Sequence, residues 1–338
     1  MSTPQIKTIA TLGSHSALQI AKGGKDEGFE TLIICTPDRT EFYERFNCID
    51  HVFTIPSYSD FASAEEKLRE CQAILVPHGS FVAYLGKERN KQLRTPYFGN
   101  KAVLDWEEDR GKQREWMKAA DIKQPAHFDN IENVTYPVIV KSYGAAGGKG
   151  YFYAKNRDDF ESRIKTLGDR SFIIQEYVIG VTLYVHYFQS PLTDGIEIMS
   201  IDRRYETNVD SLGRIPLANQ EDLTIEPSFV VVGNQPLAIR ESMLSEAFYM
   251  GERAVKASRE LISPEGIFGP FCLETVITPD QQIYVIELSG RIVAGTNLFT
   301  HGSPYSWYNY DVPMSTGRRV AHEVRMAQDQ GKLDLILG

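Results

Sequence analysis

The sequence contains no apolar run close to the roughly 18–20 residues that a helix needs to cross a bilayer. Residues 1–5 lack a basic segment followed by an apolar one, so we expect no secretory signal and a cytoplasmic protein. The 4 cysteines form no CxxC pair and no zinc-ligand spacing. Three of them lie in or beside apolar runs, a pattern that favours reduced, buried thiols over disulfides.

Basic residues are also in the minority. The 36 Lys and Arg against 45 Asp and Glu give a formal net charge of −9. Nonspecific nucleic-acid binding needs a basic surface, so this class of function is excluded, and nothing in the sequence predicts a membrane partner. An anionic small ligand is still allowed, because local positive charge and helix N-termini bind phosphate even on an acidic protein.

Internal repeats and low-complexity segments are absent as well, and 42% hydrophobic with 24% charged residues is ordinary for a globular protein. At roughly 150 residues per domain, the 338 residues predict about two domains or one larger composite. Over the first hundred residues short apolar runs alternate with helical patterns, which indicates a parallel sheet with helical crossovers. Strand patterns dominate afterwards. We therefore expect an α/β fold followed by an α+β fold, with boundaries near residues 100 and 190.

The same patterns predict individual elements. Strands are expected at 8–12, 31–35, 52–55, 73–76, 137–141, 151–155, 171–178 and 181–189. Helices are expected at 16–27, 60–71, 100–120, 157–167, 240–261 and 316–330, with a hairpin at 270–288.

A glycine-rich stretch at 144–150 (Gly-Ala-Ala-Gly-Gly-Lys-Gly) separates two predicted strands. Small residues let backbone N–H groups approach phosphate oxygens, and Lys141 and Lys149 add positive charge. The spacing fits neither Walker A nor GxGxxG, and the context is strand–loop–strand. A flexible hairpin tip is the alternative. Against it, Lys141 at the end of an apolar strand would be costly to bury without an anion.

An acidic pair, Glu274 and Glu287, lies in the predicted hairpin. If residues 279–282 form the turn, Thr278 faces Ile283 and Glu274 faces Glu287. Two carboxylates this close repel each other unless a cation lies between them, and Mg²⁺ takes one or two carboxylates plus phosphate oxygens. The alternative is an exposed acidic hairpin with counter-charges such as Arg291.

Two similar turns follow strands of the N-terminal sheet. Gly-Ser-His-Ser at 13–16 and Pro-His-Gly-Ser at 77–80 each end a predicted strand and open a helix. Ligands of open α/β sheets bind at the carboxyl ends of the strands, so His15, Ser16 and Ser80 could meet one anionic ligand. The alternative is that Ser16 and Ser80 are ordinary helix caps.

These features together resemble the ATP-grasp superfamily. Longer motifs resemble one family within it, the archaeal formate-dependent synthetases of 5-formaminoimidazole-4-carboxamide ribonucleotide (FAICAR): Ile-Ala-Thr-Leu-Gly-Ser-His-Ser-Ala-Leu at 9–18, Pro-His-Gly-Ser-Phe-Val-Ala-Tyr at 77–84, Asp-Arg-Arg-Tyr-Glu-Thr-Asn at 202–208 and Gly-Pro-Phe-Cys-Leu-Glu at 269–274. The resemblance implies a Rossmann-like pre-ATP-grasp domain at 1–100, an ATP-grasp N-terminal lobe with a glycine-rich lid at 101–190, and a C-terminal lobe with a metal-binding hairpin at 191–338.

The resemblance also implies site residues. The aminoimidazole carboxamide ribonucleotide (AICAR) would be contacted by His15, Ser80 and Asn234. ATP would be held by Lys141, Gly144, Gly147, Gly148, Lys149, Gln175, Glu176, Tyr177, Val178 and Glu206, with the hinge 175–178 on an edge strand. Mg²⁺ or Mn²⁺ would be held by Glu274 and Glu287. Arg291 is the candidate catalytic residue, for the transferring phosphoryl group or acyl phosphate, with an ion pair to Glu274 or Glu287 as the alternative.

The activity implied by the resemblance is an ADP-forming C–N ligation in purine synthesis. Formate would be converted by ATP to formyl phosphate, which the amine of AICAR would attack. The family also implies a homo-oligomer, with a hexamer as one form. Two departures stand out: Ser289 replaces an Asn common two residues after the second Glu, and Ala146 replaces Arg or Lys in the lid. Another ATP-grasp acid–amine ligase, or a nucleotide sensor without turnover, is the alternative function.

Overall fold

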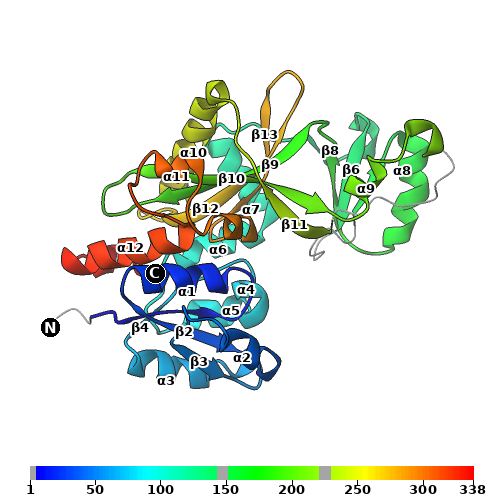
Figure 1. Ribbon diagram of the computed structural model, residues 1–338. Coiled ribbons are helices and arrows are strands. Elements are labelled where there is room, and N and C mark those ends of the chain that lie inside the picture. The colour runs from blue at the N-terminus through cyan, green and yellow to red at the C-terminus, as the bar shows by residue number, and fades with distance from the viewer. Residues whose placement is uncertain (1–4, 143–150, 221–229) are drawn as a thin grey trace.

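The computed structural model describes residues 5–142, 151–220 and 230–338, which form three sheets (Figure 1). The first sheet is parallel, in the order β3–β2–β1–β4: β1 (Thr8–Leu12), β2 (Glu30–Cys35), β3 (His51–Thr54) and β4 (Ala73–Leu75). Its connections contain α1 (Ala17–Asp26), α2 (Pro37–Tyr43) and α3 (Ala62–Glu70), and α4 (Phe81–Leu85) and α5 (Lys87–Gln92) follow β4. The predicted α/β unit is confirmed.

The prediction of a single helix at 100–120 is wrong, because this segment forms two helices. Asn100 caps α6 (Lys101–Glu108) by accepting the Ala102 N–H, and α7 (Arg110–Ala119) then starts afresh. Between them Asp109 is extended (φ −96°, ψ 109°), and its carboxylate accepts the N–H groups of Gly111 and Lys112. An aspartate inside a helical pattern can cap a new helix instead of continuing the old one.

The second sheet is small and antiparallel, in the order β5–β8–β6–β7: β5 (His127–Phe128), β6 (Val138–Ser142), β7 (Tyr151–Ala154) and β8 (Phe172–Glu176). Helix α8 (Arg157–Ile164) packs on it through Phe160 over Val138 and Val140. In Figure 1 this lobe lies to one side of the other two sheets.

The third sheet has five antiparallel strands, in the order β11–β10–β9–β12–β13: β9 (Val181–Gln189), β10 (Ile196–Glu206), β11 (Val231–Pro236), β12 (Gly269–Ile277) and β13 (Ile283–Ser289). Its other elements include α9 (Val209–Leu212) and α10 (Glu241–Leu261). Strand β9 ends close to residue 190, where we expected a boundary. It is nevertheless the central strand of this sheet, so it packs with the strands that follow it in the sequence. The α/β unit is therefore followed by α+β structure, as predicted.

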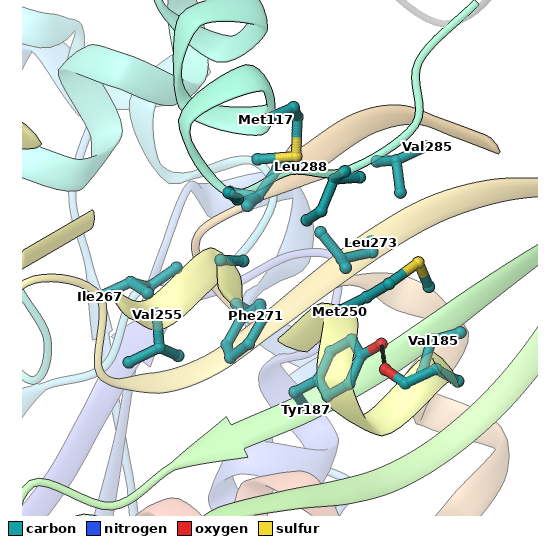
Figure 2. Packing of buried hydrophobic residues seen from close by; sticks show 14 of the residues in the cluster. Met117, Val185, Tyr187, Met250, Val255, Ile267, Phe271, Leu273, Val285 and Leu288 are labelled. Atoms are coloured by element: carbon teal, nitrogen blue, oxygen red, sulfur yellow. Dashed lines mark hydrogen bonds between the residues drawn. The ribbon is translucent and has the colours of Figure 1, made fainter. Parts of the chain in front are cut away.

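One face of the five-stranded sheet is covered by α10 and α7 and forms the main core (Figure 2). Figure 2 shows Met117 from α7 and Met250 from α10 gathered over Leu273 and Leu288 of the sheet. Two buried polar groups tie the helices down: Trp116 donates its indole N–H to the Ala254 carbonyl (2.8 Å), and the Tyr187 hydroxyl donates to Ala247 (2.6 Å). This core fixes the sheet that carries the candidate site.

The last part of the chain returns to the first sheet. After the 3₁₀ turn η5 (Ala294–Phe299) and α11 (Pro304–Trp307), α12 (Thr316–Asp329) packs along α1 (Figure 1). The contact is close because both helices carry glycine. A Cβ on Gly23 would lie 2.2 Å from the Arg318 nitrogen, and one on Gly317 would lie 2.4 Å from the Gln19 oxygen. Across the described ranges, no helix has both the length and the apolar character to span a membrane.

The α1–α12 crossing generates a stability prediction. Gly23→Ala should lower the free energy of unfolding by about 1–3 kcal/mol, because the added methyl must push two helix backbones apart. This outweighs the gain in helix propensity, which is at most about 1 kcal/mol. Urea unfolding measures the difference. Gly213→Ala is the control, because its Cβ would meet its nearest atom at an ordinary 3.7 Å. Equal stability of the two variants would contradict the close crossing.

Candidate active site

The face of the five-stranded sheet that turns away from the main core is polar in its central part. Directly opposed residues of antiparallel strands share a face, as do alternate residues along one strand. The registers therefore place six polar side chains on this face: Asn234 from β11, Arg204 and Asp202 from β10, Tyr184 from β9, Glu274 from β12 and Glu287 from β13.

The predicted facing of Glu274 and Glu287 is confirmed, but the register that led to it is wrong near the turn. Ile277, not Thr278, pairs with Ile283. A β-bulge between Glu274 and the next residue of β12 then shifts the register by one and brings the two glutamates opposite each other. Bulges re-aim side chains and are frequent beside active sites.

The carboxylate pair is enclosed, not exposed. The Glu274 side chain is 13% exposed, and one of its oxygens lies 2.5 Å from the Arg204 guanidinium. Burial raises the pKa of Glu274 to about 7; Arg204 opposes this shift and the neighbouring Glu287 adds to it. The Arg204 guanidinium itself stacks 3.8 Å from the Tyr184 ring centroid. The alternative of a solvated acidic hairpin is therefore wrong.

The donor set fits a hard divalent cation. A positive ion between the two carboxylates would remove the repulsion that raises the Glu274 pKa. Within the described ranges, no cluster of three or more His, Cys, Asp or Glu side chains could hold a metal ion. An ion here would thus take its other ligands from a bound molecule and from water, which is the usual arrangement for Mg²⁺. Ser289, at the position where the resemblance implied Asn, is buried opposite Cys272.

A cavity of about 240 Å³ lies beside Glu287 and brings together residues that are distant in sequence. Its lining includes the predicted Lys141 and Gln175, and also Arg110 and Arg114 of α7, which the sequence analysis missed. Burial, then Arg110, lowers the pKa of Lys141 to about 8, and the two glutamates oppose the shift. An anion in this cavity would restore the full charge of the lysine.

The predicted hinge residues Gln175 and Glu176 end β8. Their strand is not the edge strand that we expected, because β5 pairs along its outer side. The Gln175 side-chain nitrogen lies 3.2 Å from a His127 ring nitrogen. Glu176 donates its N–H to the Ala126 carbonyl (2.8 Å) and accepts the Ala126 N–H on its carboxylate (2.9 Å). One Glu176 oxygen is thus engaged with the backbone.

The next two hinge residues, Tyr177 and Val178, continue toward the five-stranded sheet. Tyr177 donates its N–H to the Pro137 carbonyl (3.0 Å), and its ring contacts Tyr153 edge-on. Burial, then Tyr153 and Glu206, raises the pKa of Tyr177, which places Glu206 near its hydroxyl. Val178 is half-buried. The structure therefore gathers the hinge and Glu206 at one edge of the small lobe.

The predicted glycine-rich loop lies outside the described residues, with Gly144, Gly147, Gly148 and Lys149 in it. The strands on its two sides do pair, with Lys141 opposite Tyr151. The two flanking strands are thereby confirmed, and the phosphate role of residues 144–150 stays a prediction.

The two Gly-Ser turns lie side by side, because β1 and β4 are neighbours in the first sheet. Ser16 and Ser80 do occupy the N-cap positions of α1 and α4, as the alternative expected, but neither makes a side-chain capping bond. The Ser16 hydroxyl instead lies 2.9 Å from the His15 Nδ1. The Ser80 hydroxyl interacts with that of Tyr84, which also lies 2.8 Å from the Ser14 hydroxyl.

Two histidines stack between these turns. The rings of His15 and His78 are 5.5 Å apart and nearly parallel. Burial lowers the pKa of His15 to about 3, with His78 and Arg291 adding to the shift, and lowers that of His78 to about 4. His15 has a left-handed backbone (φ 50°), and a Cβ on Gly79 would lie 2.3 Å from its Nε2. Both rings are therefore neutral hydrogen-bonding groups. The uncommon backbone conformation of His15 is of a kind that clusters at functional sites.

Arg291 does form an ion pair, but not with either expected glutamate. Its guanidinium lies 2.7 Å from Glu107 of α6, which also accepts the Gly290 N–H (2.8 Å). Burial raises the pKa of Glu107, and Arg291 opposes this. A second cavity, of about 270 Å³, is lined by both residues and by His78. Glu107 was missed because an acidic residue on an amphipathic helix carries no sequence signal of its own.

Asn234 lies farther along the polar face. Its side-chain nitrogen donates to Asp202 (2.7 Å). The turn η5 connects this region to the histidines, because Gly295 lies against Asp202 and the Asn297 amide donates to the His15 carbonyl (2.9 Å). The structure thus links Asn234 to His15 through a short segment, while Ser80 interacts with Tyr84 and donates its N–H to the His78 ring.

Comparisons with known proteins extend over the whole of this arrangement. Two family models match, one described as a domain of unknown function (DUF1297) over residues 153–338 and one as a protein of unknown function (DUF1246) over residues 9–128. The 5-formaminoimidazole-4-carboxamide-1-(beta)-D-ribofuranosyl 5'-monophosphate synthetase of Pyrococcus horikoshii is 50% identical, covering 97% of this chain and 99% of that one. The synthetase of Saccharolobus solfataricus is 46% identical with 97% and 99% coverage. The chain belongs to this synthetase family.

Solved structures agree with the family. The crystal structure of an IMP biosynthesis protein PurP from Thermococcus kodakaraensis matches with a TM-score of 0.79 and 28% identity, covering 98% of this chain and 100% of that one. An N5-carboxyaminoimidazole synthetase from Staphylococcus aureus complexed with ADP matches with a TM-score of 0.65 at 15% identity, covering 87% and 73%. The fold is therefore the ATP-grasp fold with a Rossmann-like N-terminal domain, as the sequence resemblance implied.

The carboxylate pair generates a pH prediction. Because folding raises the pKa of Glu274, the folded protein binds more protons than the unfolded chain between the two pKa values, and its stability falls as the pH rises through this window. Glu274→Gln should flatten this dependence between pH 5 and about pH 7, by at most about 1.4 kcal/mol per pH unit. Urea unfolding across the pH range measures it. Parallel profiles for the variant and the wild type would contradict the buried pair.

Proposed function

We propose that this protein joins formate to the amine of AICAR at the expense of ATP, forming FAICAR, ADP and phosphate. The family membership supports this reaction, and the site offers a place for each reactant. The observation that carries it is that the two cavities share a wall: Glu107 and Glu108 line both the Lys141 cavity and the Arg291 cavity. A nucleotide on one side and a small acid on the other would meet beside Glu287.

The Lys141 cavity suits the phosphates of ATP. Lys141, Arg110 and Arg114 bring three basic groups to a cavity that is also lined by Glu107, Glu108 and Glu287. Gln175, Glu176, Tyr177, Val178 and Glu206 would hold the adenine and ribose, and Gly144, Gly147, Gly148 and Lys149 the terminal phosphates. A Mg²⁺ or Mn²⁺ ion held by Glu274 and Glu287 would neutralise charge on the phosphate oxygens.

The Arg291 cavity suits formate and the acyl phosphate. Formate is a poor acylating agent, because its oxygen is a poor leaving group. Its attack on the terminal phosphorus of ATP makes formyl phosphate and releases ADP. The amine of AICAR then attacks the formyl carbon, the C–O bond to phosphate breaks, and the amine proton leaves with phosphate. Arg291, already paired with Glu107, would stabilise the oxygens of the acyl phosphate.

The paired turns suit the ribotide. His15 lines a cavity of about 790 Å³ together with Asn297 of η5. Ser80 in the neighbouring turn and Asn234 on the polar face would supply further hydrogen-bonding groups. Because the pKa of His15 is lowered to about 3, the ring would contact the ribotide as a neutral donor or acceptor and not as a cation or general base.

The reaction is tested by ADP release from the wild-type protein with ATP, Mg²⁺ and AICAR, with and without formate. We expect release that depends on both formate and AICAR. Glu287→Gln should lower the rate by at least about 100-fold with an unchanged unfolding midpoint, because it removes a metal ligand. Glu252→Gln, on the exposed side of α10, is the matched control and should keep the wild-type rate.

Three results would contradict the proposal. ADP release that needs AICAR but another acid would indicate a different ligase. Tight ATP binding with no ADP formed under any acid–amine combination would indicate a sensor. Near-normal turnover in the double variant Glu274→Gln/Glu287→Gln would remove the metal assignment.

A further inference from the structure

Asp202 is a fully buried carboxylate to which the proposed chemistry gives no role. It lies on β10 and is 0% exposed. One oxygen is 2.5 Å from the His186 Nε2, and the other accepts the Asn234 side-chain N–H at 2.7 Å. The backbone at Gly295 encloses it from a third direction, because a Cβ there would lie 2.1 Å from the Asp202 Oδ1. The carboxylate therefore has little room to rotate.

The hydrogen bond to Asn234 has only one chemically possible direction. A carboxylate has no proton to donate, so the Asn234 amide must donate through its NH₂ group. The amide is planar, and its oxygen points away from its nitrogen. Because the Asn234 Nδ2 is bonded to Asp202, the Asn234 Oδ1 is turned away from Asp202. Asn234 thus presents a hydrogen-bond acceptor, and not a donor, to a ligand on its other side.

The position of Asn234 makes this bond important. β11 is an edge strand of the five-stranded sheet, and its neighbouring residues Val231 and Val232 are 39% and 62% exposed. A side chain on such a strand is not held by packing from both sides. The charge-assisted bond to the buried Asp202 is stronger than a neutral one and fixes which atom of the amide faces outward.

His186 holds the other side of the same carboxylate. Its ring is buried on β9, and within the described ranges its Nδ1 has no hydrogen-bond partner. A ring with its proton on Nε2 suits this setting, because Nε2 then donates to Asp202 and Nδ1 needs no acceptor. Three neighbouring strands thus supply a chain of two hydrogen bonds, from His186 through Asp202 to Asn234. The chain ends at the predicted ribotide contact.

We propose that Asp202 is a positioning residue that turns the Asn234 carbonyl oxygen toward the ribotide, so that the site selects a ligand with an N–H donor there. This inference rests on the proposed function, in which Asn234 contacts AICAR. The base of AICAR carries such donors on its amino and carboxamide groups. A ligand with an oxygen acceptor in the same place would face oxygen against oxygen and would be rejected.

The variant Asp202→Asn tests the orientation. With the His186 proton on Nε2, the new amide accepts from His186 through its oxygen, so its NH₂ group faces Asn234 and forces that amide to reverse. Asn234 would then turn its NH₂ group toward an N–H group of AICAR, and two donors cannot form a hydrogen bond. We expect the KM for AICAR to rise roughly 10- to 100-fold, while the KM for ATP changes less than about 2-fold. Asn234→Ala, which has neither the amide oxygen nor the amide nitrogen, is the reference. It should raise the KM for AICAR no more than Asp202→Asn does.

The exchanged pair Asp202→Asn/Asn234→Asp is the sharpest arm of the experiment, because it keeps the net charge and the same two side chains. The amide at 202 would donate to the carboxylate at 234, whose other oxygen faces the ligand again as an acceptor. We expect this double variant to recover most of the AICAR affinity lost in Asp202→Asn. A merely structural role for Asp202 predicts no such recovery.

The possible results distinguish the positioning role of Asp202 from the proposed function. An unchanged AICAR KM in Asp202→Asn, or a double variant no better than the single one, overturns the positioning role alone. A wild-type protein without AICAR-dependent ADP release overturns both this role and the proposed function. If Asp202→Asn does not fold, Asn234→Asp replaces it. It sets two carboxylates against each other and should raise the AICAR KM, and an unchanged KM there overturns the proposal.

Discussion

Two carboxylates that face each other on a largely enclosed sheet surface set the main constraint on this molecule. Glu274 and Glu287 face each other and repel, and burial makes the ionised form of Glu274 still less favourable. The surrounding residues compensate this charge. Arg204 contacts Glu274 from within the sheet. Lys141 from the small lobe interacts with both glutamates, which oppose the lowering of its pKa by burial and by Arg110. Buried groups of both signs whose pKa values are shifted in this way are typical of a functional site.

The fold explains why these groups meet. Strand alternation puts the polar residues of β9 to β13 on one face and the core residues on the other, where α7 and α10 cover them. The turns after β1 and β4 of the first sheet then meet this polar face through η5 and Arg291. The close glycine crossing of α1 and α12 holds the two parts together. Each part thus contributes one wall of the site.

Much of this was predictable from the sequence, because alternation and periodicity are local. Strand β1, the capping of α6 by Asn100 and the glutamate pair are examples. The remaining features depend on contacts that no local pattern encodes. The bulge in β12–β13 corrected a wrong turn register, Asp109 divided an expected helix, and the short β5 removed an expected edge strand. The pairings of Glu107 with Arg291 and of Asp202 with Asn234 join residues far apart in sequence.

The central claim is that the glutamate pair holds a divalent ion against a bound triphosphate. Crystals grown with Mn²⁺ and a non-hydrolysable ATP analogue, measured at the manganese absorption edge, test it most directly. We expect an anomalous peak between the Glu274 and Glu287 carboxylates, in contact with phosphate oxygens, with Lys141 close to the same phosphates. A nucleotide bound with no anomalous peak at the pair, and Glu274 still paired only with Arg204, would contradict the account.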